Sequence, residues 1–265
     1  MMPPPRICEV PLSLIGVWSI LLWVLAAAGH GSVAPSHNPS AARENPPVIV
    51  IGFVGGYVHR DDSVHSVVQL AERLQRDYPS GVYAAVYENH CGDEAHEAVL
   101  HLLDADHDGS LSPEEKKSAR VILYGHSWGA SEAVTLAREL EADDVPVLLT
   151  LQVDSIAKKD ENDAVIPPNV AEAANFFQPD GVIHGRAAIR AADPSRTQIL
   201  GNFEFDYKKN PVRCDAYPWF GRTFAKTHIE IECDPAVWSQ VELLIRSKLP
   251  PPLQTGLSQS QSATE

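Results

Sequence analysis

The sequence predicts an α/β domain in which a mostly parallel β-sheet is sandwiched by helices. Short runs of β-branched and other apolar residues alternate with segments in which apolar residues recur at helical spacing. This is the pattern of parallel strands joined by helices. About two hundred residues separate the polar, Pro-rich ends of the chain, which is enough for one large core and too few for two comfortable domains.

The expected elements follow one another along residues 48–249. Residues 48–53 form a short β-branched run, and residues 147–153 are mostly apolar, as expected of buried parallel strands. The first helix shows apolar residues at helical spacing, and a Pro-Ser-Gly sequence at 79–81 stops it. The remaining strands are expected at 82–87, 119–124 and, more loosely patterned, 197–205, and the helices at 61–78, 93–103, 130–141 and 235–249.

Residues 155–196 lie between two expected strands and show no convincing periodicity. A loop of this size in a compact domain is usually functional, so we interpret the segment as the wall or lid of a binding cleft. A partly disordered insertion is the alternative.

The two ends of the chain are predicted to lie outside the domain. Residues 1–28 combine a positively charged start, a nearly unbroken apolar stretch and a small-residue cleavage site, which indicates a secretory signal peptide. A retained membrane anchor is the alternative, because the apolar stretch approaches spanning length. Residues 29–47 and 250–265 are predicted to form a flexible leader and a disordered tail. The protein is therefore expected to be secreted or periplasmic.

The net charge of the chain argues against some classes of binding partner. With 21 basic and 35 acidic side chains, its formal net charge is −14 at pH 7. Such an acidic chain is a poor partner for nucleic acid or for an anionic membrane. Membrane contact is expected only if the N-terminal segment is retained.

The cysteines support no metal site, because no Cys-x-x-Cys spacing occurs. Cys8 falls in the expected signal peptide, so Cys91, Cys214 and Cys233 belong to the mature chain. In an oxidising compartment Cys214 and Cys233 could pair, which would leave Cys91 outside the pair. The sequence leaves this pairing open.

A Gly-His-Ser-Trp-Gly motif at residues 125–129 is the most informative stretch of the chain. It follows the expected strand at 119–124 and precedes the expected helix at 130–141. A strand, a sharp turn with glycine on either side and a helix together form the setting of a nucleophile elbow, which exposes a serine at the edge of a sheet. The motif predicts that Ser127 is a nucleophile, and an ordinary strand-to-helix turn is the alternative.

On this motif the domain at residues 48–249 resembles the α/β-hydrolase superfamily. The resemblance implies an α/β-hydrolase fold in which an acid and then a histidine follow the serine, each after a later strand. A serine hydroxyl is a weak nucleophile until an imidazole takes its proton and a carboxylate orients that imidazole.

The resemblance implies specific residues for these roles. Asp154 ends the strand at 147–153 within a Val-Asp-Ser sequence similar to that of thioesterase-type members, and it is the predicted acid. Asp206, after the looser strand, is the alternative acid. His228, shortly before the last helix, is the predicted base, with His184 as the runner-up.

Two backbone amides are expected to stabilise the oxyanion. One is the amide of Trp128, which follows the nucleophile at a helix N-terminus. The resemblance implies a second donor in the glycine-containing segment after the first strand, either Phe53 or Val54. Ile51 occupies the place where the superfamily usually has a histidine, so the choice between these two amides stays open.

A second motif precedes the elbow, because residues 104–115 fit the EF-hand calcium loop in register. Gly109 occupies the sharp turn and Leu111 the inward-packing position. We expect a structural Ca²⁺ that pins the segment leading to Ser127, and a solvated acidic connector is the alternative. The expected ligands are Asp104, Asp106, Asp108, Ser110 through its carbonyl, Ser112 through a water, and Glu115.

These motifs predict a secreted, calcium-stabilised serine hydrolase that cleaves a small-molecule or lipid-like ester or thioester through an acyl-enzyme on Ser127. The alternative is a non-catalytic calcium-binding scaffold or binding protein on the same fold, because a fold does not guarantee chemistry. Aromatic residues could line an apolar acyl pocket, although they are as often part of the core. They are Phe53, Trp128, Phe176, Phe177, Trp219 and Phe220.

Overall fold

The computed structural model describes residues 46–251. The expected signal peptide, all but the last two residues of the expected leader, and the tail from residue 252 lie outside the described residues. Between residues 46 and 251, none of the helices combines the length and apolarity that crossing a membrane requires.

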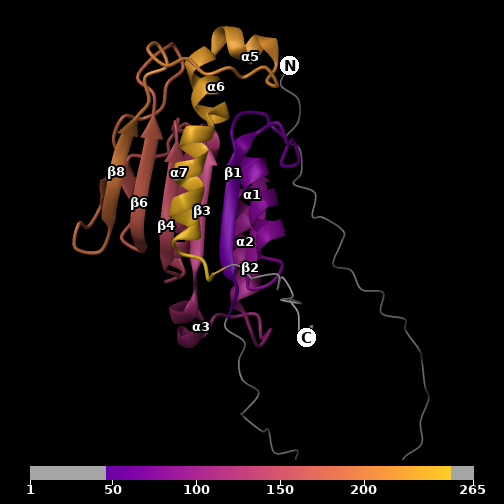
Figure 1. Cartoon of the computed structure of the whole chain (residues 1–265). Coiled ribbons are helices and arrows are strands. Elements are labelled where there is room, and N and C mark those ends of the chain that lie inside the picture. The colour runs from indigo at the N-terminus through magenta and orange to yellow at the C-terminus, as the bar shows by residue number, and fades with distance from the viewer. Residues whose placement is uncertain (1–45, 252–265) are drawn as a thin grey trace, which may run out of the picture. The chain divides into compact units, whose positions relative to one another are not determined.

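Six parallel strands form the central sheet, in the order β2-β1-β3-β4-β6-β8 (Figure 1). Two further strands pair with each other in a separate small sheet. The main strands are β1 (Val48–Val54), β2 (Val82–Glu88), β3 (Val121–His126), β4 (Val147–Val153), β6 (Val170–Phe177) and β8 (Gln198–Glu204), and the small pair is β5 (Val165–Ile166) with β7 (Arg190–Ala191). The predicted α/β class is confirmed.

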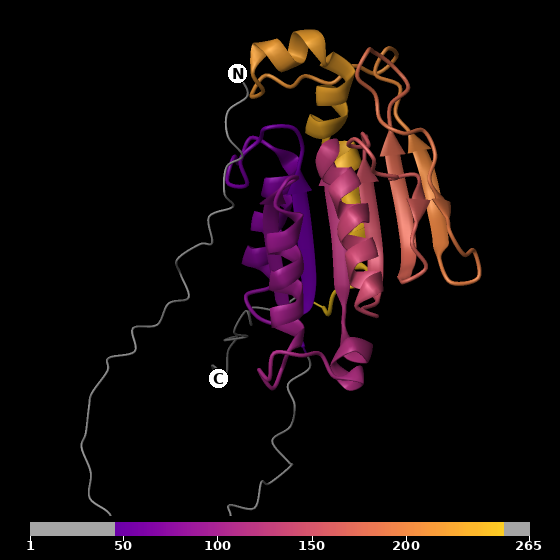
Figure 2. The ribbon, with the colours of Figure 1, turned by 180° about the vertical axis from the view of Figure 1, so that it is seen from behind.

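Helices cover both faces of the sheet, which explains why every residue of β1 and β3 is buried. Helices α1 (Ser66–Asp77) and α7 (Pro235–Arg246) lie on the face seen in Figure 1. Helices α2 (Gly92–Leu103) and α4 (Trp128–Ala142) lie on the face seen in Figure 2. Three shorter helices complete the domain: α3 (Pro113–Ser118), α5 (Trp219–Phe224) and α6 (Lys226–Cys233).

Strand β6 corrects the interpretation of residues 155–196 as one lid. This strand lies inside the main sheet, between β4 and β8. Its apolar pattern is interrupted by Glu172 and by Asn175, a fully buried amide that donates to the carbonyl of Arg186 and to the Asn202 side chain. A side chain whose N–H groups are bonded in this way can occupy a core strand, and the interruption hides the strand from a search for periodicity.

A disulfide joins Cys214 to Cys233, with the two Cα atoms 5.8 Å apart. It ties the connection after β8 to the last residue of α6. Within residues 46–251 no cysteine is free, so the expectation that Cys91 is left without a partner is wrong.

Candidate active site

Ser127 sits in a strained turn between β3 and α4. Its backbone has φ 58° and ψ −126°, and its amide donates to the carbonyl of Val153 at 3.0 Å. The flanking glycines are sterically required: a Cβ on Gly129 would lie 2.2 Å from the carbonyl oxygen of Phe53, and one on Gly125 would lie 2.4 Å from the Gly129 carbonyl. A positive φ held by close packing on both sides is the geometry of a nucleophile elbow.

Asp154 and His228 form a buried hydrogen-bonded pair at the same edge of the sheet. Nδ1 of His228, on α6, lies 2.6 Å from Oδ2 of Asp154, directly after β4. Their side chains are 8% and 0% exposed. Because Nδ1 donates to the carboxylate, Nε2 keeps its lone pair and is available to accept a proton.

The carboxylate of Asp154 is held by three further donors. The backbone amides of Gln178 and Gly185 donate to Oδ1 at 3.3 and 2.7 Å, and the Gln178 side chain donates to Oδ2 at 3.0 Å. Burial alone would raise the pKa of Asp154, yet the hydrogen bonds and charge of His228 together with Gln178 hold it below its usual value. The carboxylate therefore stays ionised beside the imidazole.

The residues around Asp154 were missed by sequence reasoning. Gln178 and Gly185 belong to the segment interpreted as a lid, and they form the wall of the acid site. Glycine is required at 185, because a Cβ there would lie 2.3 Å from the carbonyl carbon of Asp154. A sequence pattern alone gives no signal for either contact.

The neighbours of Ser127 contact the Asp154–His228 pair. The ring of His126, which precedes the serine, lies 4.5 Å from the ring of His228 between centroids. The Ser127 amide donates a hydrogen bond to the carbonyl of Val153, the residue that precedes Asp154. The hydrogen bonds between residues 46 and 251 include none from the Ser127 hydroxyl to the imidazole. Such contacts are often long without substrate and tighten when it binds.

The two alternatives from the sequence lie away from this pair. Asp206 is bonded to the amide and ammonium group of Lys209, the latter at 2.6 Å. His184 is exposed, and its Nδ1 lies 3.4 Å from the carbonyl of the next residue. Neither Asp206 nor His184 contacts Asp154 or His228 through any hydrogen bond of the described residues.

The expected oxyanion donors lie around the same turn. Trp128 is the first residue of α4. Phe53 and Val54 are the last residues of β1 rather than part of a loop; Phe53 pairs with both β2 and β3, and Val54 with β2 only. Gly55, which the sequence analysis did not single out, faces the serine directly, since a Cβ there would lie 2.8 Å from Cβ of Ser127.

The six aromatic residues expected to line an acyl pocket do not gather in one place. Phe53, Phe176 and Phe177 are buried in the core. Trp219 and Phe220 stand on α5 with 69% and 59% of their surface exposed. Only Trp128, which packs edge-on against Tyr57 at a centroid distance of 5.9 Å, adjoins Ser127. Phe53, Phe176 and Phe177 thus belong to the core, which is the alternative to a pocket lining.

The acidic loop lies at the opposite end of the sheet, before α3 and the start of β3 (Figure 1). The carboxylate oxygens of Asp104, Asp106 and Asp108 lie within 4.8 Å of one another. Glu115 accepts the amides of Ser112 and Ala105, and these hydrogen bonds lower its pKa to about 2. The structure thus brings together three of the six expected ligands.

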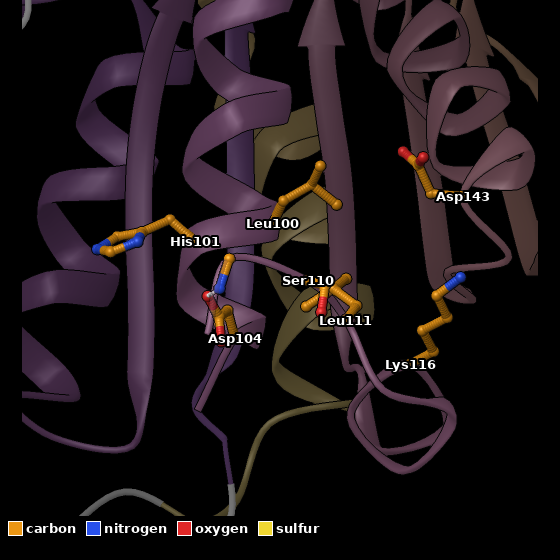
Figure 3. Close-up of a pocket in the computed structure, with 8 residues that line it drawn as sticks. Leu100, His101, Asp104, Ser110, Leu111, Lys116 and Asp143 are labelled. Carbon is orange, nitrogen blue, oxygen red and sulfur yellow. Dashed lines mark hydrogen bonds between the residues drawn. The ribbon is translucent and has the colours of Figure 1, made fainter. Parts of the chain in front are cut away.

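A pocket of about 510 Å³ adjoins this loop (Figure 3). Leu100, His101 and Leu111 line it together with Lys116 and Asp143. It contains neither Ser127 nor the Asp154–His228 pair, so it is separate from the candidate active site.

No family model matches this sequence, and neither does any curated protein. Several solved structures are similar in fold. An esterase from Pseudomonas putida is 11% identical with a TM-score of 0.38, over 79% of this chain and 77% of that one. Human thioesterase 2 is 10% identical with a TM-score of 0.37, over 76% and 95%. An acetyl xylan esterase is 13% identical with a TM-score of 0.37, over 77% and 99%. Likeness at this level carries no argument about activity, so the function must be argued from the site itself.

Proposed function

We propose that this protein is a serine hydrolase that cleaves an ester or thioester, with Ser127 as nucleophile, His228 as base and Asp154 as acid. One observation carries the proposal: a buried Asp154–His228 hydrogen bond at the edge of the sheet where Ser127 occupies a strained elbow. A strained serine and an oriented, buried imidazole at one edge of a sheet are costly to maintain without a chemical use.

The chemistry follows from these positions. Nε2 of His228 takes the proton of Ser127 as the hydroxyl oxygen bonds to the acyl carbon of the substrate, and Asp154 stabilises the imidazolium that forms. The imidazolium then gives its proton to the leaving alcohol or thiol, which departs and leaves an acyl-enzyme. In the second half, water gives a proton to the same nitrogen as its oxygen bonds to the acyl carbon. The bond from that carbon to Oγ of Ser127 then breaks, the imidazolium returns the proton to Oγ, and the acid is released. The amide of Trp128 and a second amide from Phe53 or Val54 stabilise the oxyanion.

A fluorophosphonate probe tests this proposal directly. The wild-type protein should be labelled and should hydrolyse p-nitrophenyl esters, whereas Ser127→Ala should do neither and should lose roughly 10⁴- to 10⁶-fold in kcat/KM. Ser131→Ala is the matched control, because its buried hydroxyl lies one turn along the same helix and donates to Glu161. Failure of the wild type to react would overturn the hydrolase and favour the non-catalytic scaffold. Varying the acyl length of the ester would define the substrate.

We also propose that residues 104–115 hold a structural Ca²⁺. The convergence of three carboxylates supports this, because oxygen ligands at this spacing suit a hard cation. The ionised Glu115 would complete the set after a rotation away from the Ser112 amide. The ion would lie at the amino end of β3 and stabilise the strand that leads to Ser127.

Export of the protein is part of the same proposal. The signal-like N-terminal sequence supports it, and so does the disulfide between Cys214 and Cys233, since disulfides persist in oxidising compartments.

A further inference from the structure

Three ionisable side chains are buried beside the candidate active site without a role in the proposed reaction. His65 precedes α1, His126 ends β3, and Glu232 lies on α6. Their side chains are only 10%, 4% and 4% exposed. Burying ionisable groups is expensive unless they are paired, so this cluster requires an explanation.

Glu232 joins the three elements that form the site. One of its carboxylate oxygens pairs with Nδ1 of His65, and the other lies 3.6 Å from Nδ1 of His126. On its own helix it follows His228 by four residues, so the two side chains share one helix face. The ring of His126 lies between them and faces the His228 ring with an interplanar angle of 34°.

The charges of this cluster follow from burial and pairing. Burial lowers the pKa of His126 to about 4, so this ring is neutral near pH 7. Burial alone would raise the pKa of Glu232, but its interactions with His126 and His65 keep it below its usual value. Although burial opposes it, the contact with Glu232 raises the pKa of His65. Glu232 is therefore a carboxylate, and its contact with His65 favours the protonated form of that ring.

Other charged groups face the cluster from the neighbouring elements. Asp62 lies 3.8 Å from Nε2 of His65, and the ring of Tyr217 packs edge-on against the same histidine. On the far side of His228 stands Asp154. His228 is thus flanked by a carboxylate it contacts and by a second one across the ring of His126.

We propose that Glu232 is a positioning residue for His228: it anchors α6 to His65 and His126 and places a second buried negative charge beside the base. This inference rests on the proposed hydrolase function. A buried negative charge near the imidazole favours the imidazolium that forms when Ser127 loses its proton.

Glu232→Gln tests the proposal, because it removes the charge and keeps the size. The acidic limb of the kcat/KM profile, measured with a soluble p-nitrophenyl ester, should move to lower pH by on the order of one unit. The limiting kcat should fall roughly tenfold with KM little changed. Glu230→Gln is the matched control, since Glu230 is buried on the same helix but is influenced by Lys226 rather than by the histidines. It should leave the limb in place.

A second variant should shift the pH profile of kcat/KM in the opposite direction. His65→Gln removes the positive partner of Glu232, so the acidic limb should move to higher pH. An unmoved limb in both variants, with kcat lowered equally at every pH, would make Glu232 a structural residue only and overturn the inference.

Different results would overturn the hydrolase proposal and the proposed role of Glu232. If Ser127→Ala keeps its activity, the hydrolase is wrong. The inference can still be tested by an NMR titration of the His228 ring in Ser127→Ala, where Glu232→Gln should lower the midpoint. A midpoint that does not move would overturn the inference without reference to turnover.

Discussion

The two ends of the sheet use acidic side chains in opposite ways. At the carboxyl edge, Asp154 and Glu232 are 0% and 3% exposed, and each is paired with a histidine. At the amino end, Asp106 and Asp108 are exposed beside Asp104. Within residues 46–251, no basic side chain forms an ion pair with any of these three aspartates.

The difference shows how the negative charge of the carboxylates is compensated at each end of the sheet. A buried carboxylate needs partners supplied by the chain, because an unpaired buried charge costs several kcal/mol. Exposed carboxylates can instead be neutralised by a cation from solution. The carboxyl edge should therefore respond to changes in its own residues and to pH, and the amino end to the metal content of the medium.

The largest expected effect is at Asp154. Asp154→Asn leaves the shape intact but stops the carboxylate from orienting and stabilising the imidazolium, so kcat should fall by about 10³- to 10⁴-fold. Asp206→Asn, which disturbs only the contact with Lys209, should change kcat by less than about threefold. Steady-state kinetics with one ester decides between them, and a larger loss in the Asp206 variant would reverse the assignment of the acid.

A smaller effect is expected from the buried pair of His65 and Glu232. The raised pKa of His65 stabilises the fold below pH 6.5 and loses this effect as pH rises through the folded value. The lowered pKa of Glu232 stabilises it above pH 4.5 and loses this effect as pH falls through the folded value. Between pH 4.5 and 6.5, His65 and Glu232 therefore both contribute fully to the stability of the fold.

His65→Gln should accordingly lower Tm most between pH 4.5 and 6.5, by roughly 6–10 °C for an unpaired buried charge of about 3 kcal/mol. Melting curves of both proteins across pH 3 to 9 measure it. A difference in Tm that stays constant over that range would contradict the ion pair.

The smallest effect is expected at the amino end. For a dissociation constant on the order of 10⁻⁴ M, about 1 mM Ca²⁺ contributes about 1.4 kcal/mol and raises Tm by about 3–5 °C. Asp104→Asn should abolish the rise, and the neighbouring Glu114→Gln should retain it. Turnover at 25 °C should not respond to chelator, because Ser127 lies at the far end of β3. A Tm that changes with neither calcium nor chelator would contradict the proposed Ca²⁺ site.

Local patterns were enough to predict much of the fold. The apolar run of β4 was predicted with its bounds, and β1 and β2 each extend one residue beyond the predicted end. Strands covered on both faces are mostly apolar, which makes them easy to recognise even where Thr150 and Gln152 interrupt β4. The first helix begins at Ser66, later than the predicted residue 61, because His59 to His65 form turns instead.

Other features could not be predicted because they depend on contacts distant in sequence. Asn175 in β6 is acceptable in the core only because Arg186 and Asn202 accept from it. Helix α6 carries glutamates at buried positions, and Glu232 can be buried there because it pairs with His65. No local pattern distinguishes such a residue from an exposed one.

The Gly-His-Ser-Trp-Gly motif predicted the turn at Ser127, and the resemblance to the α/β-hydrolase superfamily implied the Asp154–His228 contact that the structure contains. The donors Gln178 and Gly185 and the placement of Gly55 depend on how loops fold over the sheet, so no local sequence pattern predicts them.

His228 meets Asp154 across 74 positions of chain, beyond β6 and β8. A nascent polypeptide that has emerged only as far as β8 already holds the serine turn and the aspartate but lacks the imidazole. On the proposed chemistry, such a partial product is inert during synthesis. Hydrolysis begins only when the last quarter of the polypeptide has closed onto the sheet, so recovery of turnover after refolding would report completion of the whole domain.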